Sequence, residues 1–179
     1  MIEHLMETLI SSQNVFDGRM IRLCVDTVRL PDGKETTREV VKHPGAVAII
    51  AETEAGGLLL VTQYRYPVRL VSLELPAGKL DRDESLESAA FRELLEETGY
   101  RAQQLTKVMD FYSTPGFSDE IMHLYIARGL TFDKMQPDED EFIDCREYTR
   151  DEVTALVRAG QIKDAKTLIG VYHWLYGDI

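Results

Sequence analysis

The sequence is poor in cysteine and contains no long apolar segment. Cys24 and Cys145 lie far apart and lack the CxxC spacing of a metal or redox motif. A disulfide framework and a zinc knuckle are therefore excluded, and a reducing compartment is favoured. No apolar run approaches the roughly 20 residues that cross a bilayer. Glu3 and Glu7 interrupt the N-terminal segment, where a signal peptide would be basic and then apolar. We expect a cytoplasmic protein with no membrane partner.

Positive charge is also scarce. The chain has 20 Lys and Arg against 31 Asp and Glu, which gives a formal net charge of −11. A surface that repels phosphate groups is a poor nucleic-acid interface, so we expect no nucleic-acid partner. The excess of carboxylates suits a protein that collects divalent cations, but any soluble acidic protein could have this composition. With 179 residues, 44% of them hydrophobic, the chain is long enough to build one domain around a core.

Two β-hairpins are predicted in the first third of the chain. Residues 20–30 alternate in hydrophobicity, residues 31–34 (PDGK) are a turn sequence, and residues 36–41 resume an extended pattern. Residues 46–51 and 58–63 are apolar runs separated by a glycine-containing turn, and they predict a second hairpin.

The remaining chain mixes strands with three helices. Residues 85–98 are predicted to be helical, with Asp83 or Ser85 near the start and Gly99 after the end. Apolar residues at helical spacing predict two more helices, at 151–159 and 164–176. Further strands are predicted at 71–75, 108–112, 121–127 and 142–148. This order of elements predicts an α+β protein in which helices pack against mixed sheets.

Three glutamates gather near the end of the predicted helix 85–98. At about 100° per residue, Glu93, Glu96 and Glu97 fall within roughly one third of its circumference. Glu93 and Glu97 form a like-charge i,i+4 pair, and the helix dipole disfavours negative charge at this end. Without an intervening basic partner the cluster is expected to be locally frustrated, as functional sites often are. A bound Mg²⁺ or Mn²⁺ would relieve it, although the helix alone is equally compatible with a solvated acidic face.

The spacing of residues over a longer segment distinguishes a metal site from a solvated acidic face. From Gly78 the chain continues with five residues, Glu84, seven residues, and then the segment 92–100, which is RELLEETGY. This resembles the Nudix box, GX5EX7REUXEEXGU, in which U is a bulky aliphatic residue. Every fixed position agrees, and only the last U departs, because Tyr100 stands there. The chain is therefore similar to the Nudix hydrolase family.

The resemblance implies the Nudix fold, an α+β fold with mixed β-sheets sandwiched between helices in an α/β/α arrangement. An N-terminal β-hairpin extension would occupy residues 1–44, and residues 45–179 would form the hydrolase domain. The N-terminal segment would make substrate or dimer contacts and would not fold independently. A homodimer is implied by the resemblance alone, since no pattern in the sequence indicates one.

The resemblance also implies a loop–helix–loop that binds Mg²⁺, with Mn²⁺ as an alternative. Glu93 and Glu97 would be the principal ligands, Glu96 would lie in the same shell, and the backbone carbonyl of Ala77 would add an oxygen. Arg92 would orient a box glutamate through a charge-assisted hydrogen bond.

Three further box residues have implied supporting roles. Glu84 would lie near the cluster and hold the loop or a water molecule. Gly78 would give the loop conformational freedom, and Gly99 would close the helix.

The segments that flank the box indicate the class of substrate. Residues 63–67 (QYRYP), 74–78 (ELPAG) and 113–120, with Pro115 in the third, are similar to the ADP-ribose pyrophosphatase branch of the family. This implies hydrolysis of the diphosphate bond of a nucleoside diphosphate sugar, with ADP-ribose giving AMP and ribose 5-phosphate. Two alternatives stay open. One is GDP-mannose or a broad range of nucleoside diphosphate sugars as substrates, and the other is an inactive Nudix-fold ligand-binding module.

Candidate substrate contacts lie outside the box. Arg65 would bind the diphosphate or the terminal ribose, because its guanidinium matches phosphate geometry; the alternative is a surface arginine at the end of a strand. Arg38 and Glu39 lie on the predicted N-terminal hairpin, a segment that in relatives contacts adenine or ribose, sometimes from the other subunit. An ordinary surface role is equally compatible with both residues.

The general base is implied by the resemblance to be a glutamate on the loop before a late strand, here residues 136–141. Glu139 and Glu141 are the candidates, and the sequence does not decide between them. Consecutive acidic residues are more often a solvated loop, so the position before Phe142 is the one argument for function. Glu120, in the loop after Pro115, is a third candidate and also a candidate substrate contact.

Overall fold

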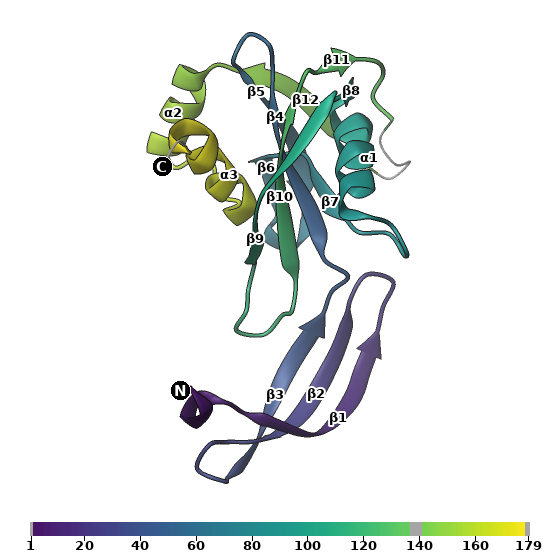
Figure 1. Ribbon diagram of the computed structural model, residues 1–179, viewed down its shortest axis with the longest axis vertical. Helices are drawn as coiled ribbons and strands as arrows, with labels where there is room; N and C mark the ends of the chain where they lie inside the picture. The colour runs from purple at the N-terminus through teal and green to yellow at the C-terminus, as the bar shows by residue number, and fades with distance from the viewer. Residues whose placement is uncertain (1, 137–140, 178–179) are drawn as a thin grey trace. The chain divides into compact units, whose positions relative to one another are not determined.

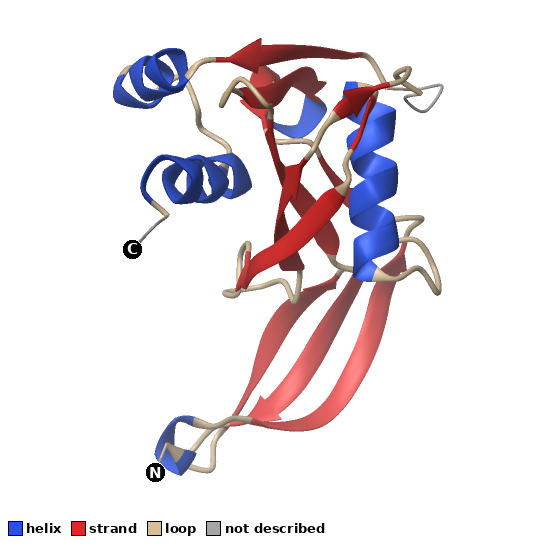
Figure 2. Cartoon of the chain, turned by 45° about the horizontal axis from the view of Figure 1, so that its top comes forward, coloured by secondary structure: helices blue, strands red, loops and turns tan. Residues whose placement is uncertain are grey.

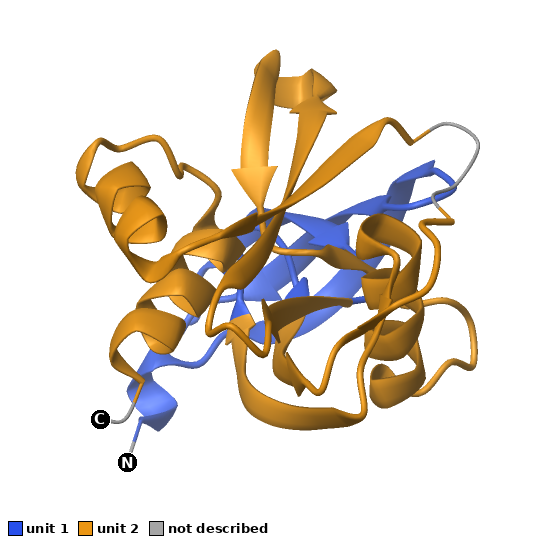
Figure 3. Cartoon of the chain, turned by 90° about the horizontal axis from the view of Figure 1, so that it is seen from above, with its two compact units in different colours: residues 1–45, 112–121 blue, residues 46–111, 122–179 orange. Residues whose placement is uncertain are grey.

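The computed structural model describes residues 2–136 and 141–177 (Figure 1), and the chain divides into two compact units (Figure 3). The first unit comprises Met1–Gly45 and Tyr112–Ile121, and the second comprises Ala46–Phe111 and Met122–Ile179. The segment 112–121 belongs with the N-terminal strands although it lies far from them in the sequence. Backbone hydrogen bonds tie it to Val41, whose N–H donates to the Phe117 carbonyl at 2.8 Å. The predicted division after residue 44 does not anticipate this segment.

The first unit is an antiparallel sheet with the strand order β1-β2-β3. β2 (Arg22–Arg29) and β3 (Glu35–Lys42) pair along their whole length, from Arg22 opposite Lys42 to Arg29 opposite Glu35. The predicted first hairpin is confirmed.

The strand β1 (Thr8–Asp17), which follows the short 3-10 helix η1 (Glu3–Leu5), is not predicted from the sequence. Its pairing with β2 shifts between Leu9 and Ser11 and again between Asn14 and Phe16. Each irregularity changes the face to which later side chains point, so apolar and polar residues do not alternate along the strand. The extension is therefore a three-stranded sheet rather than a hairpin.

The second unit is built on a mixed seven-stranded sheet. Its path is β12-β5-β4-β10-β9, with β6 paired to β5 and β7 paired to β4. β4 and β10 pair in parallel, whereas β5 pairs antiparallel with β4, β6 and β12, and β7 pairs antiparallel with β4. The strands are β4 (Ala46–Glu52), β5 (Leu58–Arg65), β6 (Leu70–Glu74), β7 (Ala77–Lys79), β9 (Gln104–Tyr112), β10 (Ile121–Arg128) and β12 (Ile143–Tyr148). Two shorter elements, β8 (Tyr100–Arg101) and β11 (Thr131–Phe132), pair with each other, and η2 (Tyr66–Val68) follows β5.

Helices cover both faces of this sheet, which explains why its central strands are continuously apolar. Along β4, Ala46, Ala48 and Ile50 join the core on one face, whereas Val47, Ile49 and Ala51 join the core on the other. The first face packs against α2 (Arg150–Arg158) and α3 (Ala165–Tyr176), and the second packs against α1 (Leu86–Thr98) (Figure 2). The predicted α/β/α arrangement is confirmed, as are the three predicted helices within a residue or so.

No helix in the described residues is both long and apolar enough to span a bilayer.

Candidate metal and substrate site

The helix that carries the box, α1, begins and ends as the sequence predicts. The Ser85 hydroxyl accepts a hydrogen bond from the backbone N–H of Ser88 at 3.2 Å and so caps the first turn. Gly99 ends the helix in the left-handed region, with φ of 76°, and donates its N–H to the Leu95 carbonyl at 2.9 Å. Because Ala90 and Leu94 are fully buried against the sheet, the helix is fixed where its glutamates meet β7.

Gly78 in β7 lies directly against Glu93. A Cβ atom at residue 78 would fall 2.0 Å from the carboxyl carbon of Glu93, far inside van der Waals contact. The expected reason for this glycine, conformational freedom, is wrong, since its φ lies outside the left-handed region. What requires glycine here is space for the Glu93 carboxylate.

Arg92 joins three glutamates of the box. Its Nε and Nη2 donate to the two carboxylate oxygens of Glu84 at 3.0 and 2.8 Å. Its Nη1 donates to Oε1 of Glu93 at 2.7 Å and to Oε2 of Glu96 at 3.0 Å. Hydrogen bonds to Glu84 first, and to Glu93 next, raise the pKa of Arg92, so it stays charged. The expectation that the acidic cluster lacks a basic partner is therefore wrong.

Among the described residues, Glu97 is the box glutamate without an ion-pair partner. Its side chain is buried, and Oε2 accepts a hydrogen bond from the backbone N–H of Ala77 at 2.9 Å. In the described part of the chain, no Lys, Arg or His lies within ion-pair distance of it. Burial, together with the charges of Glu93 and Glu141, raises the pKa of Glu97 from 4.5 to about 8. Burial likewise raises the pKa of Glu93 to about 7, although Arg92 opposes the shift.

The pair Glu93 and Glu97 fits a hard divalent cation. Two buried carboxylates with raised pKa values require either protons or a cation, and carboxylate oxygens are the ligands that Mg²⁺ prefers. Because Gly78 has no side chain, the Glu93 carboxylate can occupy the space beside it. Among residues 2–136 and 141–177, no three acidic, His or Cys side chains already converge as metal ligands. Arg92 binds one oxygen of Glu93 and one of Glu96.

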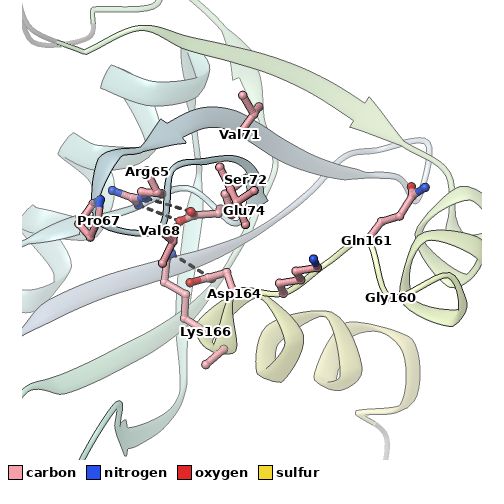
Figure 4. A pocket seen from close by; sticks show the side chains of 13 residues that line it. Arg65, Pro67, Val68, Val71, Ser72, Glu74, Gly160, Gln161, Asp164 and Lys166 are labelled. Carbon is pink, nitrogen blue, oxygen red and sulfur yellow. Dashed lines mark hydrogen bonds and ion pairs between the residues drawn. The ribbon is translucent and has the colours of Figure 1, made fainter.

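Arg65 lies at the end of β5 in a charged network that lines a cavity of about 760 Å³ (Figure 4). Its Nε and Nη2 donate to the two oxygens of Glu74 at 2.9 and 2.8 Å. Lys166 in α3 donates to the same carboxylate and to Asp164, the latter at 3.0 Å. Burial alone would raise the pKa of Glu74, but hydrogen bonds from Arg65 and the charge of Lys166 lower it from 4.5 to about 2. Glu97 also helps to raise the pKa of Arg65, so the network lies within electrostatic reach of the box.

Glu74 and Lys166 are absent from the predicted site. Glu74 opens the ELPAG segment before the box, but its role depends on a lysine 92 positions further along the chain. A buried glutamate needs a cationic partner, but nothing in the sequence shows which Lys or Arg is that partner.

Of the two candidate bases in residues 136–141, Glu139 lies outside the described residues. Glu141 is described and exposed. Its charge contributes to the raised pKa values of both Glu93 and Glu97. Glu141 is therefore within electrostatic reach of the candidate metal ligands.

Three other predicted residues lie in the first unit, whereas the box lies in the second. Arg38 in β3 is paired with Glu7, to which its Nε donates at 3.0 Å, and Glu39 is exposed. Glu120 accepts a hydrogen bond from the Ser113 hydroxyl and lies 3.5 Å from Nδ1 of His43.

Sequence comparisons agree with this geometry. A sequence profile described as "NUDIX domain" matches residues 41–170, and one described as "Nucleoside diphosphate sugar hydrolase N-terminal domain" matches residues 7–41. The chain belongs to the Nudix family, and it is a hydrolase of that family.

Its relatives carry several names, among them ADP-ribose pyrophosphatase. The chain is 44% identical to a Bacillus subtilis protein named ADP-ribose pyrophosphatase, over 96% of this chain and 94% of that one. It is also 44% identical to a Bacillus methanolicus protein named methanol dehydrogenase activator, over 93% and 91% of the two chains. A Yersinia enterocolitica protein named GDP-mannose pyrophosphatase is 35% identical over 70% of each chain. The predicted resemblance to the family and to its ADP-ribose pyrophosphatases is confirmed.

A solved structure described as an ADP compounds hydrolase shares the fold. It superposes with a TM-score of 0.83 over 96% of this chain and 95% of that one, at 22% sequence identity. The predicted Nudix fold is confirmed.

Proposed function

We propose that this protein hydrolyses the diphosphate bond of ADP-ribose to give AMP and ribose 5-phosphate, with a divalent cation as cofactor. The observation that carries this proposal is the buried pair Glu93 and Glu97, whose raised pKa values mark a place where a cation would be stabilising. The 44% identity to a protein named ADP-ribose pyrophosphatase supports the choice of substrate.

Glu93 and Glu97 would hold Mg²⁺, or Mn²⁺ in its place, with Glu96 and the Ala77 carbonyl as further oxygen donors. When bound, the cation neutralises the diphosphate and lowers the pKa of the attacking water. Arg92 keeps Glu93 and Glu96 on one side of the site through Nη1, and its bidentate bond to Glu84 fixes the guanidinium.

Arg65 would bind a phosphate or the terminal ribose of the substrate. Its Nε and one N–H of Nη2 are held by Glu74. In the described part of the chain, the N–H groups of its Nη1 have no hydrogen-bond partner. One edge of the guanidinium is thus anchored and the other is open to an anion.

Glu141 would be the general base that takes a proton from the attacking water. Its electrostatic effect on Glu93 and Glu97 supports this choice. Glu139 is the alternative on the same loop.

The N-terminal strands would form a homodimer contact and present Arg38 and Glu39 to the nucleoside. The support is an apolar surface on the first unit, in which large side chains are exposed: Leu5, Met6, Leu9, Ile10, Val15 and Phe16. A monomeric protein rarely leaves so many apolar side chains in water on one small unit. Glu120 stays a candidate contact on the same unit. The reducing, cytoplasmic location also stays a prediction from the sequence.

A substrate panel tests the proposed function. The purified protein with Mg²⁺ is assayed for phosphate release by a coupled phosphatase on ADP-ribose, GDP-mannose and other nucleoside diphosphate sugars. We expect the highest kcat/KM for ADP-ribose. A higher value for GDP-mannose would support the second substrate class. Binding of ADP-ribose without turnover of any compound would support the ligand-binding module.

A further inference from the structure

Glu74 is a buried charge that depends on two cations from distant parts of the chain. Its side chain is 2% exposed, whereas the side chain of Arg65 is 41% exposed and that of Lys166 is 12% exposed. A buried carboxylate is costly unless it is paired and hydrogen-bonded on all sides. Arg65 supplies two hydrogen bonds from β5, and Lys166 supplies another from the first turn of α3. Glu74 therefore links α3 to Arg65 (Figure 4).

The start of α3 is itself firmly placed. Asp164 caps the helix by accepting from the backbone N–H of Thr167 at 3.0 Å, and its Oδ2 also accepts from Lys166 at 3.0 Å. The Thr167 hydroxyl accepts from the backbone N–H of Leu75 at 2.8 Å. Glu74 and Leu75 are thus both hydrogen-bonded to the first turn of α3.

This arrangement makes the direction of Arg65 depend on Lys166. Arg65 is half-exposed, and its side chain donates hydrogen bonds to the two oxygens of Glu74. The carboxylate plane of Glu74 decides where the open edge of the guanidinium points. Lys166 in α3 contacts Oε2 of that carboxylate, so its loss would leave the carboxylate plane set by the half-exposed Arg65 alone.

We propose that Lys166 is a positioning residue, which sets the orientation of Arg65 through Glu74 and so sets the affinity for the substrate. The proposal rests on the proposed function, in which Arg65 binds the substrate. Lys166 acts on binding and not on the reacting atoms, so its loss changes KM more than kcat.

The test compares Lys166→Met, Lys166→Arg and the control Lys163→Met in steady-state assays with ADP-ribose and Mg²⁺. Lys163 also lines the cavity but has no ion-pair partner in the described residues. We expect Lys166→Met to raise KM about tenfold, the size expected for a charged hydrogen bond, with kcat within about twofold. Lys166→Arg should recover most of the affinity, because arginine keeps the charge. Lys163→Met should stay within about twofold of the parent protein in both constants.

A double-mutant cycle with Arg65→Met separates positioning from direct contact. If Lys166 acts through Arg65, Lys166→Met adds less than about twofold to KM in the Arg65→Met background. Fully additive effects would mean that Lys166 contacts the substrate itself and would overturn the proposal. An unchanged KM in Lys166→Met beside a raised KM in Arg65→Met would overturn it as well.

The two proposals fail in different ways. An unchanged KM in Arg65→Met would remove the substrate role of Arg65 in the proposed function, and the positioning role with it. Circular dichroism and thermal unfolding check that each variant is folded. Should Lys166→Met not fold, Asp164→Asn serves in its place, because asparagine can still cap α3 while removing the charge that orients Lys166. It is expected to raise KM in the same direction, and a parental KM in that variant would count against the proposal.

Discussion

The backbone N–H of Ala77 donates to Oε2 of Glu97 at 2.9 Å, and this bond joins β7 to the last turn of α1 across 20 positions of the chain. It is one neutral donor for a carboxylate that is buried and has a raised pKa. The oxygens of Glu97 are therefore under-compensated for a charged group. This imbalance should make the stability of the metal-free protein depend on pH.

The first prediction concerns the pH dependence of the stability of the metal-free protein. The pKa values of Glu93 and Glu97 in the folded chain, about 7 and about 8, lie above the value of 4.5 for an unperturbed glutamate. The folded state therefore holds these protons more tightly than the unfolded state. The stability that they contribute is complete below pH 4.5 and is lost as the pH rises through about 7 to 8. In EDTA, we expect the Tm to fall progressively from about pH 4.5 to about pH 8 and to level off above that.

Added Mg²⁺ should oppose that fall. Because a cation competes with protons for the same oxygens, the rise in Tm on adding Mg²⁺ should be larger at about pH 8.5 than at about pH 6. The control is Glu97→Gln, which removes the group with the higher pKa and should flatten the pH dependence in EDTA. A Tm that is independent of both pH and Mg²⁺ would contradict the metal assignment.

The second prediction concerns the space at Gly78. In Gly78→Ala, the new Cβ would lie 2.0 Å from the carboxyl carbon of Glu93, so this carboxylate must move. We expect kcat/KM to fall about 100-fold, the effect of misplacing a group at the reaction centre by an ångström. Isothermal titration calorimetry should show weaker Mg²⁺ binding. Gly116→Ala is the matched control, since a Cβ there meets nothing within 4 Å, and it should keep parental activity. Parental activity in Gly78→Ala would mean that Glu93 does not have to occupy its observed position.

The sequence predicts those parts of the site that depend on residues close to one another in the chain. Helix 85–98, its Ser85 cap and its Gly99 end are local features, because the hydrogen bonds that define them join residues three or four positions apart. The box glutamates follow from the same spacing. The contacts of this helix with the residues around it are predicted less well. Glycine is required at residue 78 because Glu93 lies beside it. The helix pattern alone suggests no basic partner for the acidic cluster, although Arg92 contacts Glu96 four positions further on, in agreement with the role that the family resemblance implies for it.

The parts that escape sequence analysis depend on pairings between distant segments. Glu74 and Lys166 meet only because α3 returns to the end of β6. In the same way, β1 is hidden because its irregular pairing with β2 removes the alternation by which a strand is recognised. In both cases the information lies in tertiary contacts and not in the local pattern.

The third prediction tests the proposed homodimer. Leu9 in β1 is 59% exposed within the chain, and we propose that it is covered by the second subunit. Leu9→Asp should weaken self-association roughly tenfold or more, because a buried unpaired carboxylate opposes the interface. Sedimentation equilibrium over a range of concentrations measures this directly. Gln13→Asp, an exposed polar position in the same strand, is the control for added charge and should have a smaller effect. A parent protein that sediments as a monomer at all concentrations would remove the proposed contact.

The last prediction concerns the general base. If Glu141 accepts the proton of the attacking water, Glu141→Gln should lower kcat by a factor on the order of 10² to 10⁴. The side chain is exposed, so the Tm should change little. Because Glu141 also helps to raise the pKa values of Glu93 and Glu97, its neutralisation should move the pH dependence of Mg²⁺ binding towards lower pH. That shift reports the charge of Glu141 near the two glutamates, whereas the loss of kcat reports its role as the base. Glu139→Gln, on the same acidic loop, is the comparison. A large loss in Glu139→Gln beside parental turnover in Glu141→Gln would transfer the role to Glu139, and parental turnover in both variants would exclude this loop as the source of the base.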